Sequence, residues 1–376
     1  MIFSNHIFSF KRLSLSLGIG SFSSLVQRII NSTIKKKSLL LLCFSSLLIF
    51  LFMNSCVSNS TEPEPNYEPG RRDYVWTADT IKAYYVYFNS IWGKTVNDVW
   101  MVSLVGSVLE NTYRYDGTKW YREINAPIGN TVSLWGTESN VWISTHEGRI
   151  WKYRNNIFSS SPQFMYDGKA IDFFSMAGKN DNEVYACGGK FMPYNRDGLL
   201  YKYNGSSWQL DRVLKNYGNL YKVRYSDKNN RYYILSYIDN KDIADTTQLL
   251  EYDGITVKSI LYQDIGENFT INNIDGYLYV SKGNKIYRYY DETLNAYLEV
   301  SNPNFRGQVW GRNKNDLLIQ MQDGLMHFNG SDLKYILKFP TNTEYGSAAL
   351  VLERDVFLHA FDNRTGYNII YHGILK

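Results

Sequence analysis

The hydrophobic pattern of this chain repeats a motif in which two aromatic residues flank a basic residue and a turn pair follows. Clear copies are YRYDG at 113–117 and YKYNG at 201–205. Seven copies align on one aromatic residue each: Tyr115, Tyr153, Tyr203, Tyr252, Tyr289, Phe328 and Tyr371. Neighbouring copies lie about 43 residues apart on average, and a fixed period in this range indicates a repeat protein.

A second motif lies upstream of the first in the clear copies. It reads Trp-Gly and then Asn-Asp-Val-Trp, as in IWG at 91–93 followed by NDVW at 97–100. Further copies are LWG at 134–136 with NVW at 140–142, AG at 177–178 with NEVY at 182–185, and VWG at 309–311 with NDLL at 315–318. The fifth copy has lost Trp-Gly and keeps only the turn pair Asp275-Gly276.

Each repeat can be divided into four strands. The Trp-Gly stretch is a first strand, and Asn-Asp supplies the turn to a continuous apolar second strand such as 99–102. The aromatic-basic-aromatic stretch alternates, as a third strand nearer the solvent does. Asp-Gly or Asn-Gly is a hairpin pair that leads into a fourth strand such as 118–121. Four strands in about 40 residues are typical of a propeller blade.

We therefore predict an all-β fold, a single β-propeller of seven four-stranded blades. The last repeat ends so close to the C-terminus that 374–376 is too short for a full outer strand. Residues 73–88 form an additional strand-like segment before the first Trp-Gly. We expect this N-terminal segment to pair with the blade that contains Tyr371 and to close the ring, which removes its open sheet edges.

The order of these motifs resembles the propeller repeats of secreted bacterial proteins, which are loosely related to Asp-box and WD-type repeats. The resemblance covers about residues 85–376. The Asp-box itself is absent, and DGTKW at 116–120 and NGSSW at 204–208 only approach it. The resemblance implies the fold and leaves the function open, because this architecture hosts many functions.

The N-terminal part of the chain has the pattern of a secretory leader. Three lysines at 35–37 precede an apolar run at 39–53, and Cys56 follows directly. This arrangement resembles a bacterial lipoprotein signal, which implies that Cys56 carries a lipid after cleavage. A transmembrane anchor is the alternative, although the run is shorter than the roughly 20 apolar residues that a span needs. The 34 residues that begin the chain precede this signal, which indicates a translation start placed too far upstream.

These features divide the chain into three parts. Residues 1–55 are the leader and signal peptide, 56–72 are the lipidated cysteine with a flexible tether rich in Pro, Glu and Ser, and 73–376 are the propeller. We expect the protein in the bacterial cell envelope, anchored to the outer membrane or the cell surface.

The charge of the chain argues against nucleic acid as a partner. Residues 1–55 contain six basic and no acidic side chains. Without those six, 34 of the 40 basic residues remain against 36 acidic ones, a net charge of −2. A near-neutral protein has no global field to attract a polyanion. The three cysteines, Cys43, Cys56 and Cys187, exclude a disulfide framework and have no metal-site spacing.

The sequence contains none of the common hydrolase, zinc-protease, nucleotide-loop or calcium-loop motifs. His327 and His372 fall inside the repeat pattern and are interpreted as structural. His146 belongs to a turn, and His359 is ambiguous. We expect the repeated aromatic residues to pack between blades, so we assign no catalytic residue, no cofactor and no metal.

Two insertions interrupt the regular repeat, at 187–198 in the third copy and 238–247 in the fourth. Both join a second strand to a third strand, so we expect them on one rim of the ring, in adjacent blades. Loops held by a rigid scaffold are favoured binding sites. The candidate ligand-binding residues are Tyr194, Arg196, Asp197, Asp239, Asp242 and Asp245. The last three are also possible oxygen ligands for a hard cation, but their spacing matches no known calcium loop.

The sequence therefore predicts a lipid-anchored, monomeric binding or scaffold module that takes a protein or a glycan at one rim. The alternative is a propeller enzyme that acts on glycans, a hydrolase or a lyase, which would need catalytic carboxylates or several arginines converging at one end of the channel.

Overall fold

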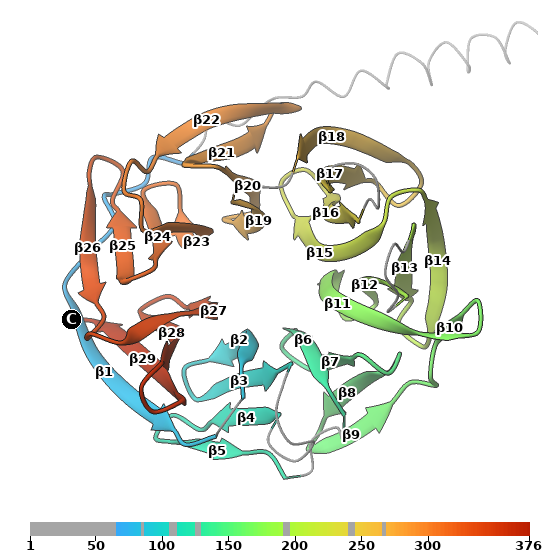
Figure 1. Ribbon diagram of the computed structural model, residues 1–376, viewed down its shortest axis with the longest axis horizontal. Helices are drawn as coiled ribbons and strands as arrows, with labels where there is room; N and C mark the ends of the chain where they lie inside the picture. Colours follow the sequence, from blue (N-terminus) through green and yellow to red (C-terminus); the bar gives the residue numbers. More distant parts are fainter. Residues whose placement is uncertain are drawn as a thin grey trace, which may run out of the picture. The chain divides into compact units, whose positions relative to one another are not determined.

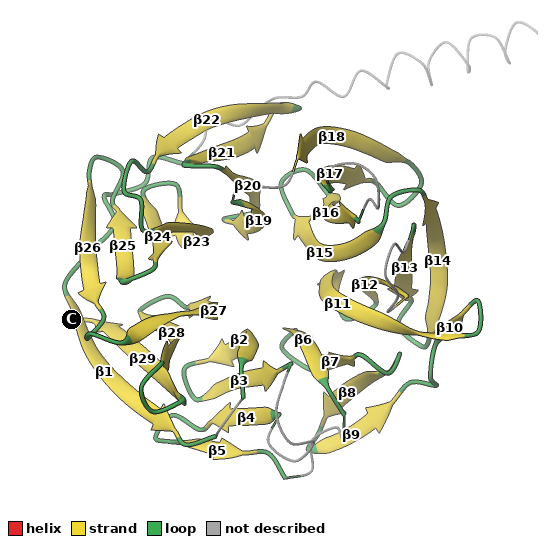
Figure 2. Cartoon of the chain, in the orientation of Figure 1, coloured by secondary structure: helices red, strands yellow, loops and turns green. Residues whose placement is uncertain are grey.

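The computed structural model describes residues 65–83, 86–104, 111–124, 129–190, 196–239, 245–264 and 268–376. Seven antiparallel sheets stand around a central axis, and the described residues form strands and turns without a helix (Figures 1 and 2). They include no helical segment that could cross a bilayer. The blades belong to one compact unit, Tyr67–Lys376. The predicted all-β propeller of seven blades is confirmed.

The strands follow each other from the axis outward in every blade. Blade 1 comprises β2 (Phe88–Thr95), β3 (Asp98–Ser103), β4 (Thr112–Tyr115) and β5 (Trp120–Arg122). Blade 2 comprises β6 (Thr131–Gly136), β7 (Val141–Thr145), β8 (Ile150–Arg154) and β9 (Ile157–Ser160). Blade 3 comprises β11 (Lys169–Asn180), β12 (Glu183–Lys190), β13 (Asp197–Tyr203) and β14 (Trp208–Lys215), and the short β10 (Met165–Tyr166) pairs with β11.

The remaining blades keep the same order. Blade 4 comprises β15 (Asn219–Ser226), β16 (Arg231–Ile238), β17 (Thr246–Tyr252) and β18 (Val257–Asp264). Blade 5 comprises β19 (Phe269–Ile274), β20 (Tyr277–Lys282), β21 (Lys285–Tyr290) and β22 (Thr293–Glu299). Blade 6 comprises β23 (Phe305–Asn313), β24 (Asp316–Met321), β25 (Gly324–Phe328) and β26 (Leu333–Lys338). Blade 7 comprises β27 (Thr343–Val351), β28 (Asp355–Asp362), β29 (Tyr367–Leu375) and, as its outer strand, β1 (Tyr74–Ile81).

The ring is closed by the predicted N-terminal segment, although only Tyr74–Ile81 of the expected 73–88 pairs with the last blade and Phe88 already belongs to β2. Strand β1 pairs antiparallel with β29 over its whole length, from Tyr74 opposite Leu375 to Ile81 opposite Asn368. Trp76 lies against Gly373, where an added Cβ would meet the indole ring at 2.7 Å. The N-terminal strand therefore covers the edge that the short C-terminus leaves open.

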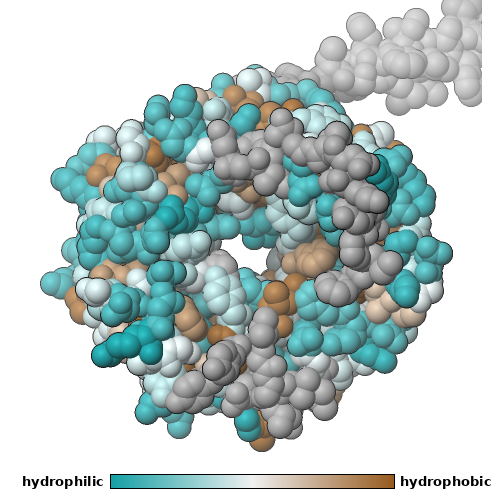
Figure 3. Space-filling view, in the orientation of Figure 1, coloured by the Kyte–Doolittle hydropathy of each residue, from teal (hydrophilic) through white to brown (hydrophobic). Residues whose placement is uncertain are grey.

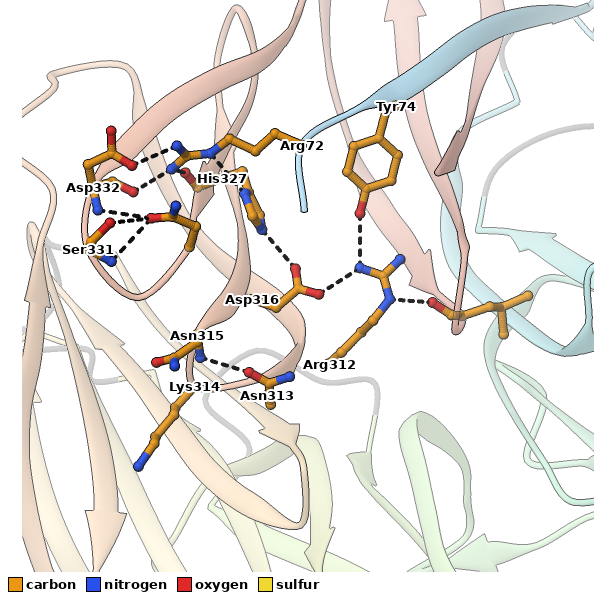
Figure 4. Close-up of polar contacts among 12 residues, drawn as sticks. Arg72, Tyr74, Arg312, Asn313, Lys314, Asn315, Asp316, His327, Ser331 and Asp332 are labelled. Atoms are coloured by element: carbon orange, nitrogen blue, oxygen red, sulfur yellow. Dashed lines mark hydrogen bonds and ion pairs between the residues drawn. The ribbon is translucent and has the colours of Figure 1, made fainter. Parts of the chain in front are cut away.

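Residues that precede β1 also contact the blades. The Arg72 guanidinium donates to Asp332 at 2.6 Å and to His327 Nδ1 at 3.1 Å (Figure 4). Arginine only donates, so Nδ1 of the buried His327 is the acceptor and its Nε2–H donates to Asp316 at 2.7 Å. Asp316 also pairs with Arg312, whose Nη1 donates both to Asp316 Oδ2 at 3.0 Å and to the Tyr74 hydroxyl at 2.9 Å. This network connects blade 6 to the closing strand and places His327 in a structural role.

The Trp-Gly motif is an interlock between blades. The Trp92 ring of blade 1 lies over Gly136 of blade 2, and Trp135 of blade 2 lies over Gly178 of blade 3; a Cβ on either glycine would meet the indole at 2.7 Å. Leu350 of blade 7 occupies the corresponding place over Gly93. Glycine is required here by the close approach of the ring and not by its backbone angles.

The basic residue of the third-strand motif also bridges two blades. Arg114 donates to Asp98 of its own blade at 2.8 Å and to the Tyr153 hydroxyl of the next blade at 3.0 Å. Its guanidinium lies over the Trp100 ring, 4.7 Å from the centroid. Lys152 repeats the arrangement from blade 2 to blade 3. The motif is therefore packing chemistry, as expected from its regular recurrence.

Candidate functional site

The inner strands of all seven blades enclose a channel along the axis, and an opening is visible at the centre of the ring (Figure 3). The channel has a volume of about 590 Å³. Its lining includes residues of β2, β6, β11, β15, β19, β23 and β27. It reaches the rim of the turns between first and second strands, because Lys179 and Asp227 also line it.

Two belts of equivalent residues run around the inner strands, and all of them except Thr270 and Leu350 are among the residues that line the channel. The tryptophan belt is defined by pairing with the same position of each second strand and consists of Trp92, Trp135, Ala177, Arg224, Asn272, Trp310 and Leu350. The serine belt lies two residues earlier in each first strand and consists of Ser90, Ser133, Ser175, Lys222, Thr270, Gln308 and Ala348. Residues two apart in a strand face the same side, so the two belts share one face of each inner strand.

Blade 4 departs from the repeat in both belts. Arg224 stands where blades 1, 2 and 6 carry tryptophan, and Lys222 stands where blades 1, 2 and 3 carry serine. Both cations come from β15. The size change is matched across the blade interface, because small Ala177 of blade 3 packs in one cluster with Tyr225, which replaces glycine in blade 4.

The two cations have neutral hydrogen-bond partners. The Lys222 ammonium donates to Thr270 Oγ1 at 2.7 Å and to Gln308 Oε1 at 3.3 Å. Arg224 donates through Nε to Asn272 Oδ1 at 3.1 Å, and through Nη1 to Ser175 Oγ at 3.3 Å and to the Val223 carbonyl at 2.8 Å. Among the described residues, no carboxylate forms an ion pair with either cation. Asp227 is the acidic residue found in the described lining.

The protein surroundings penalise both charges. Burial, and then the neighbouring Arg224 cation, lower the pKa of the Lys222 ammonium well below its usual range. Burial lowers the pKa of Arg224 to about 10. Burying a cation in the channel lining without a counter-ion costs free energy. An anionic ligand bound beside it would offset this cost.

The rim residues predicted from the sequence do not form one described site. Arg196 is exposed, but the Asp197 carboxylate accepts from Lys215 Nζ at 2.7 Å and from the Tyr166 hydroxyl at 3.2 Å, so it is held within its own blade. Tyr194 and Asp242 lie outside the described residues, as does the lipidation candidate Cys56.

Asp239 and Asp245 lie within the blade 4 insertion at 238–247, and both affect Tyr237. The Tyr237 hydroxyl donates to Asp245 at 2.7 Å. This hydrogen bond, together with burial and the charges of both aspartates, raises the pKa of Tyr237 to about 12. The described part of the chain contains no group of three or more His, Cys, Asp or Glu placed to hold a metal ion.

The histidines have structural partners. His372 contacts Asp355 at 2.7 Å in blade 7, the equivalent of the His327–Asp316 pair. His359, which the sequence leaves ambiguous, is completely buried and contacts Asn368 Oδ1 through Nε2 at 2.7 Å. His146 lies in its predicted turn, with Nδ1 2.9 Å from the buried Asp172 carboxylate of the next blade.

Sequence reasoning did not identify Lys222, and it named Arg224 only as one of the arginines, with Arg196, Arg306 and Arg364, that a sialidase-like enzyme could bring together. The signal was present, because Arg224 occupies the tryptophan position of the fourth copy. It becomes visible only when that copy is aligned through its second and third strands, since blade 4 lacks the Trp-Gly pair that marks the first strand in blades 1, 2 and 6.

Comparison with known proteins supports the fold and leaves the activity open. No family model matches the chain, and no curated protein matches it in sequence. A catalytically inactive virginiamycin B lyase from Staphylococcus aureus, with quinupristin, is similar in structure at 10% identity and a TM-score of 0.57, over 79% of this chain and 99% of that chain. YCF48 bound to a D1 peptide is similar at 13% identity and a TM-score of 0.57, over 84% and 99%.

A third similar structure is the extracellular domain of a putative hybrid two component system from B. thetaiotaomicron. It has 14% identity and a TM-score of 0.52, over 81% of this chain and 40% of that chain. At these identities the similarity shows the β-propeller fold. The functions of the three proteins differ, so the function of this chain has to be argued from its own site.

Proposed function

We propose that this protein is a lipid-anchored, monomeric binding module of the bacterial cell envelope that holds a glycan or protein ligand in its axial channel without catalysing a reaction. One observation carries the proposal: Lys222 and Arg224 replace packing residues of the repeat by cations that face the channel and have no carboxylate partner among the described residues. Such replacements do not help the blade to fold, so they favour a role in binding.

The lining also favours binding over the rival glycan hydrolase or lyase. Glycoside hydrolysis of the usual kind uses two carboxylates that flank the bond. The lining described here contains one carboxylate, Asp227, and no histidine. The alternative remains an enzyme that acts on glycans, and it would require turnover of a bound glycan.

A second candidate site is the rim formed by the insertions at 187–198 and 238–247. The exposed Arg196 and the two aspartates beside Tyr237 support it. Turns between strands one and two and turns between strands two and three lie at opposite ends of antiparallel strands. A ligand on these insertions therefore binds at the rim opposite Lys179 and Asp227.

Binding by two variants of the full chain separates the two sites. Detergent-solubilised protein is tested against a glycan array and in pull-downs from solubilised membranes. We expect Lys222→Ser with Arg224→Leu, residues that other blades carry at these positions, to abolish capture. Shortening both insertions to the length of the 282–284 turn should leave capture unchanged. If the shortened insertions abolish capture and the double substitution does not, the site lies at the rim. If a captured glycan is converted to a product, the alternative of a glycan-degrading enzyme is favoured.

The location of the protein is tested at Cys56. If this cysteine is the acylated N-terminus, Cys56→Ala releases the protein from the membrane fraction or stalls removal of the signal peptide. Cell fractionation and the mass of the mature chain measure both effects. A Cys56→Ala variant that is processed normally and still sediments with membranes would contradict the lipid anchor.

A further inference from the structure

We propose that the ligand of the channel is a carboxylated sugar, a hexuronic acid residue, whose carboxylate binds between Lys222 and Arg224. The inference rests on the proposed function and specifies its ligand chemistry. The two side chains lie two residues apart on β15, so they project from the same face of one strand toward the same space.

Both cations have donors left for a ligand. An ammonium has three N–H donors, and Lys222 uses two of them on Thr270 and Gln308. A guanidinium has five, and the bonds of Arg224 run through Nε and Nη1, so Nη2 has no partner among the described residues. The planar guanidinium and an adjacent ammonium are suited to the two oxygens of one carboxylate.

The neutral groups around the cations indicate the rest of the ligand. Hydroxyl and amide side chains of other blades line the same space: Ser133, Ser175, Asn272, Asn273 and Gln308. Such groups both donate and accept, and they therefore match the hydroxyls of a sugar. Trp92, Trp135 and Trp310 line the channel and are partly exposed, so they offer apolar rings to the C–H faces of a pyranose.

Charge and size favour a single carboxylate over a phosphate. Asp227 lies in the same lining and opposes a second negative charge. A channel of about 590 Å³ lies within the range of ordinary small-ligand pockets, roughly 300–1,000 Å³, and leaves room for one or two sugar residues. A polypeptide loop would need apolar pockets for its side chains, whereas this lining is mainly polar.

Calorimetric titration of the detergent-solubilised full chain tests the proposal with four probes: a glucuronate disaccharide, the neutral glucose disaccharide, inorganic phosphate and a glutamate-rich peptide. We expect the glucuronate disaccharide to bind at least tenfold more tightly than the other three probes. Lys222→Ser and Arg224→Leu should each weaken its binding about tenfold to a hundredfold, the usual loss for a charge-assisted hydrogen bond. Lys258→Ser, which removes an exposed cation of β18, is the matched control and should change nothing.

Each other outcome overturns the proposal. Equal binding of the neutral disaccharide removes the role of the carboxylate but leaves a glycan-binding channel, so the proposed function survives. Tighter binding of phosphate or peptide assigns the cations to another ligand class. If a variant fails to fold, the unmodified chain decides: its affinity for the glucuronate disaccharide should fall as the ionic strength rises, because salt screens the attraction between the carboxylate and the two cations, and an affinity that salt does not change contradicts the assignment.

Discussion

A buried histidine makes the stability of this propeller depend on pH. His359 is excluded from solvent, and its Nε2 contacts Asn368 Oδ1, while the amide of Asn368 donates to the Val86 carbonyl at 3.0 Å. Asn368 Oδ1 is therefore the acceptor, and the imidazole is held neutral as a donor. Burial lowers the pKa of His359 from 6.5 to about 4.

The sign of the pH effect follows from this depressed pKa. Between pH 6.5 and 4 the unfolded chain binds a proton that the folded chain excludes, so stability falls as the pH falls through this window. The pKa difference corresponds to roughly 3 kcal/mol, since each unit is worth about 1.4 kcal/mol. Urea unfolding at pH 7.5 and 4.5 should show the loss, and His359→Gln, which keeps a donor near Nε2, should reduce it. An unchanged pH slope in His359→Gln would assign the effect to other groups.

At the scale of single strands and turns, most of the fold was predictable. Each motif residue makes the same kind of contact in several blades, so its sequence pattern repeats. In the hairpin after the third strand, Asp116 Oδ1 accepts from the backbone N–H groups of Thr118 and Lys119, and Gly117 has a φ of 93°. The Tyr115 hydroxyl donates to the Gly117 carbonyl of the same turn. A Tyr-Asp-Gly sequence therefore specifies a hairpin through local chemistry, and sequence reading detects it.

The candidate site was not predictable in the same way. Lys222 and Arg224 are recognised as a site through their contacts with Thr270, Asn272 and Gln308 of blades 5 and 6, which lie 48 to 86 residues further along the chain. No repeat motif predicts the short strand β10, which is added to blade 3. Long insertions attract notice in a sequence, whereas a point replacement inside a diverged copy does not.

The contact between Trp92 and Gly136 is a testable element of the blade interface. Gly136→Ala places a Cβ 2.7 Å from the indole, so the ring has to move, and we expect a loss of about 1–3 kcal/mol. In a Trp92→Ala background the same change should cost less than about 1 kcal/mol, because the obstacle is gone. Denaturant unfolding of the wild type, both single variants and the double variant measures the coupling. Additive effects would show that the two residues do not interlock.

At the scale of the whole molecule, stability depends on one strand pairing between the two ends of the propeller. Val75 of β1 and Ile374 of β29 are directly opposite each other, and both are exposed, 48% and 42%. Cysteines at these positions should form a disulfide that holds the ring closed. The bond closes a loop of nearly the entire propeller, so we expect stabilisation of about 2–4 kcal/mol, the usual range.

The test compares the oxidised and reduced forms of one protein, Val75→Cys with Ile374→Cys. The oxidised form should unfold at a higher denaturant concentration, and peptide mapping should find the engineered bond with the native Cys187 still reduced, because that thiol is buried. Val75→Cys alone provides the control. Failure of the pair to oxidise would contradict the register between β1 and β29.

The interlock of large and small residues around the axis also bears on how such a ring can diverge. Trp92 requires Gly136, Trp135 requires Gly178, and in the next junction Ala177 instead accompanies Tyr225. A blade therefore cannot be exchanged freely. Its large residue has to pack on a small residue of the next blade, and its own small residue has to accept the large residue of the preceding blade. At the junction of blades 3 and 4 the two residues that meet across the interface are matched in size, whereas Leu350 meets an unchanged glycine, Gly93. The channel cations Lys222 and Arg224 thus lie on the strand that carries Tyr225, next to the one junction described here at which a small residue faces a large one in place of glycine.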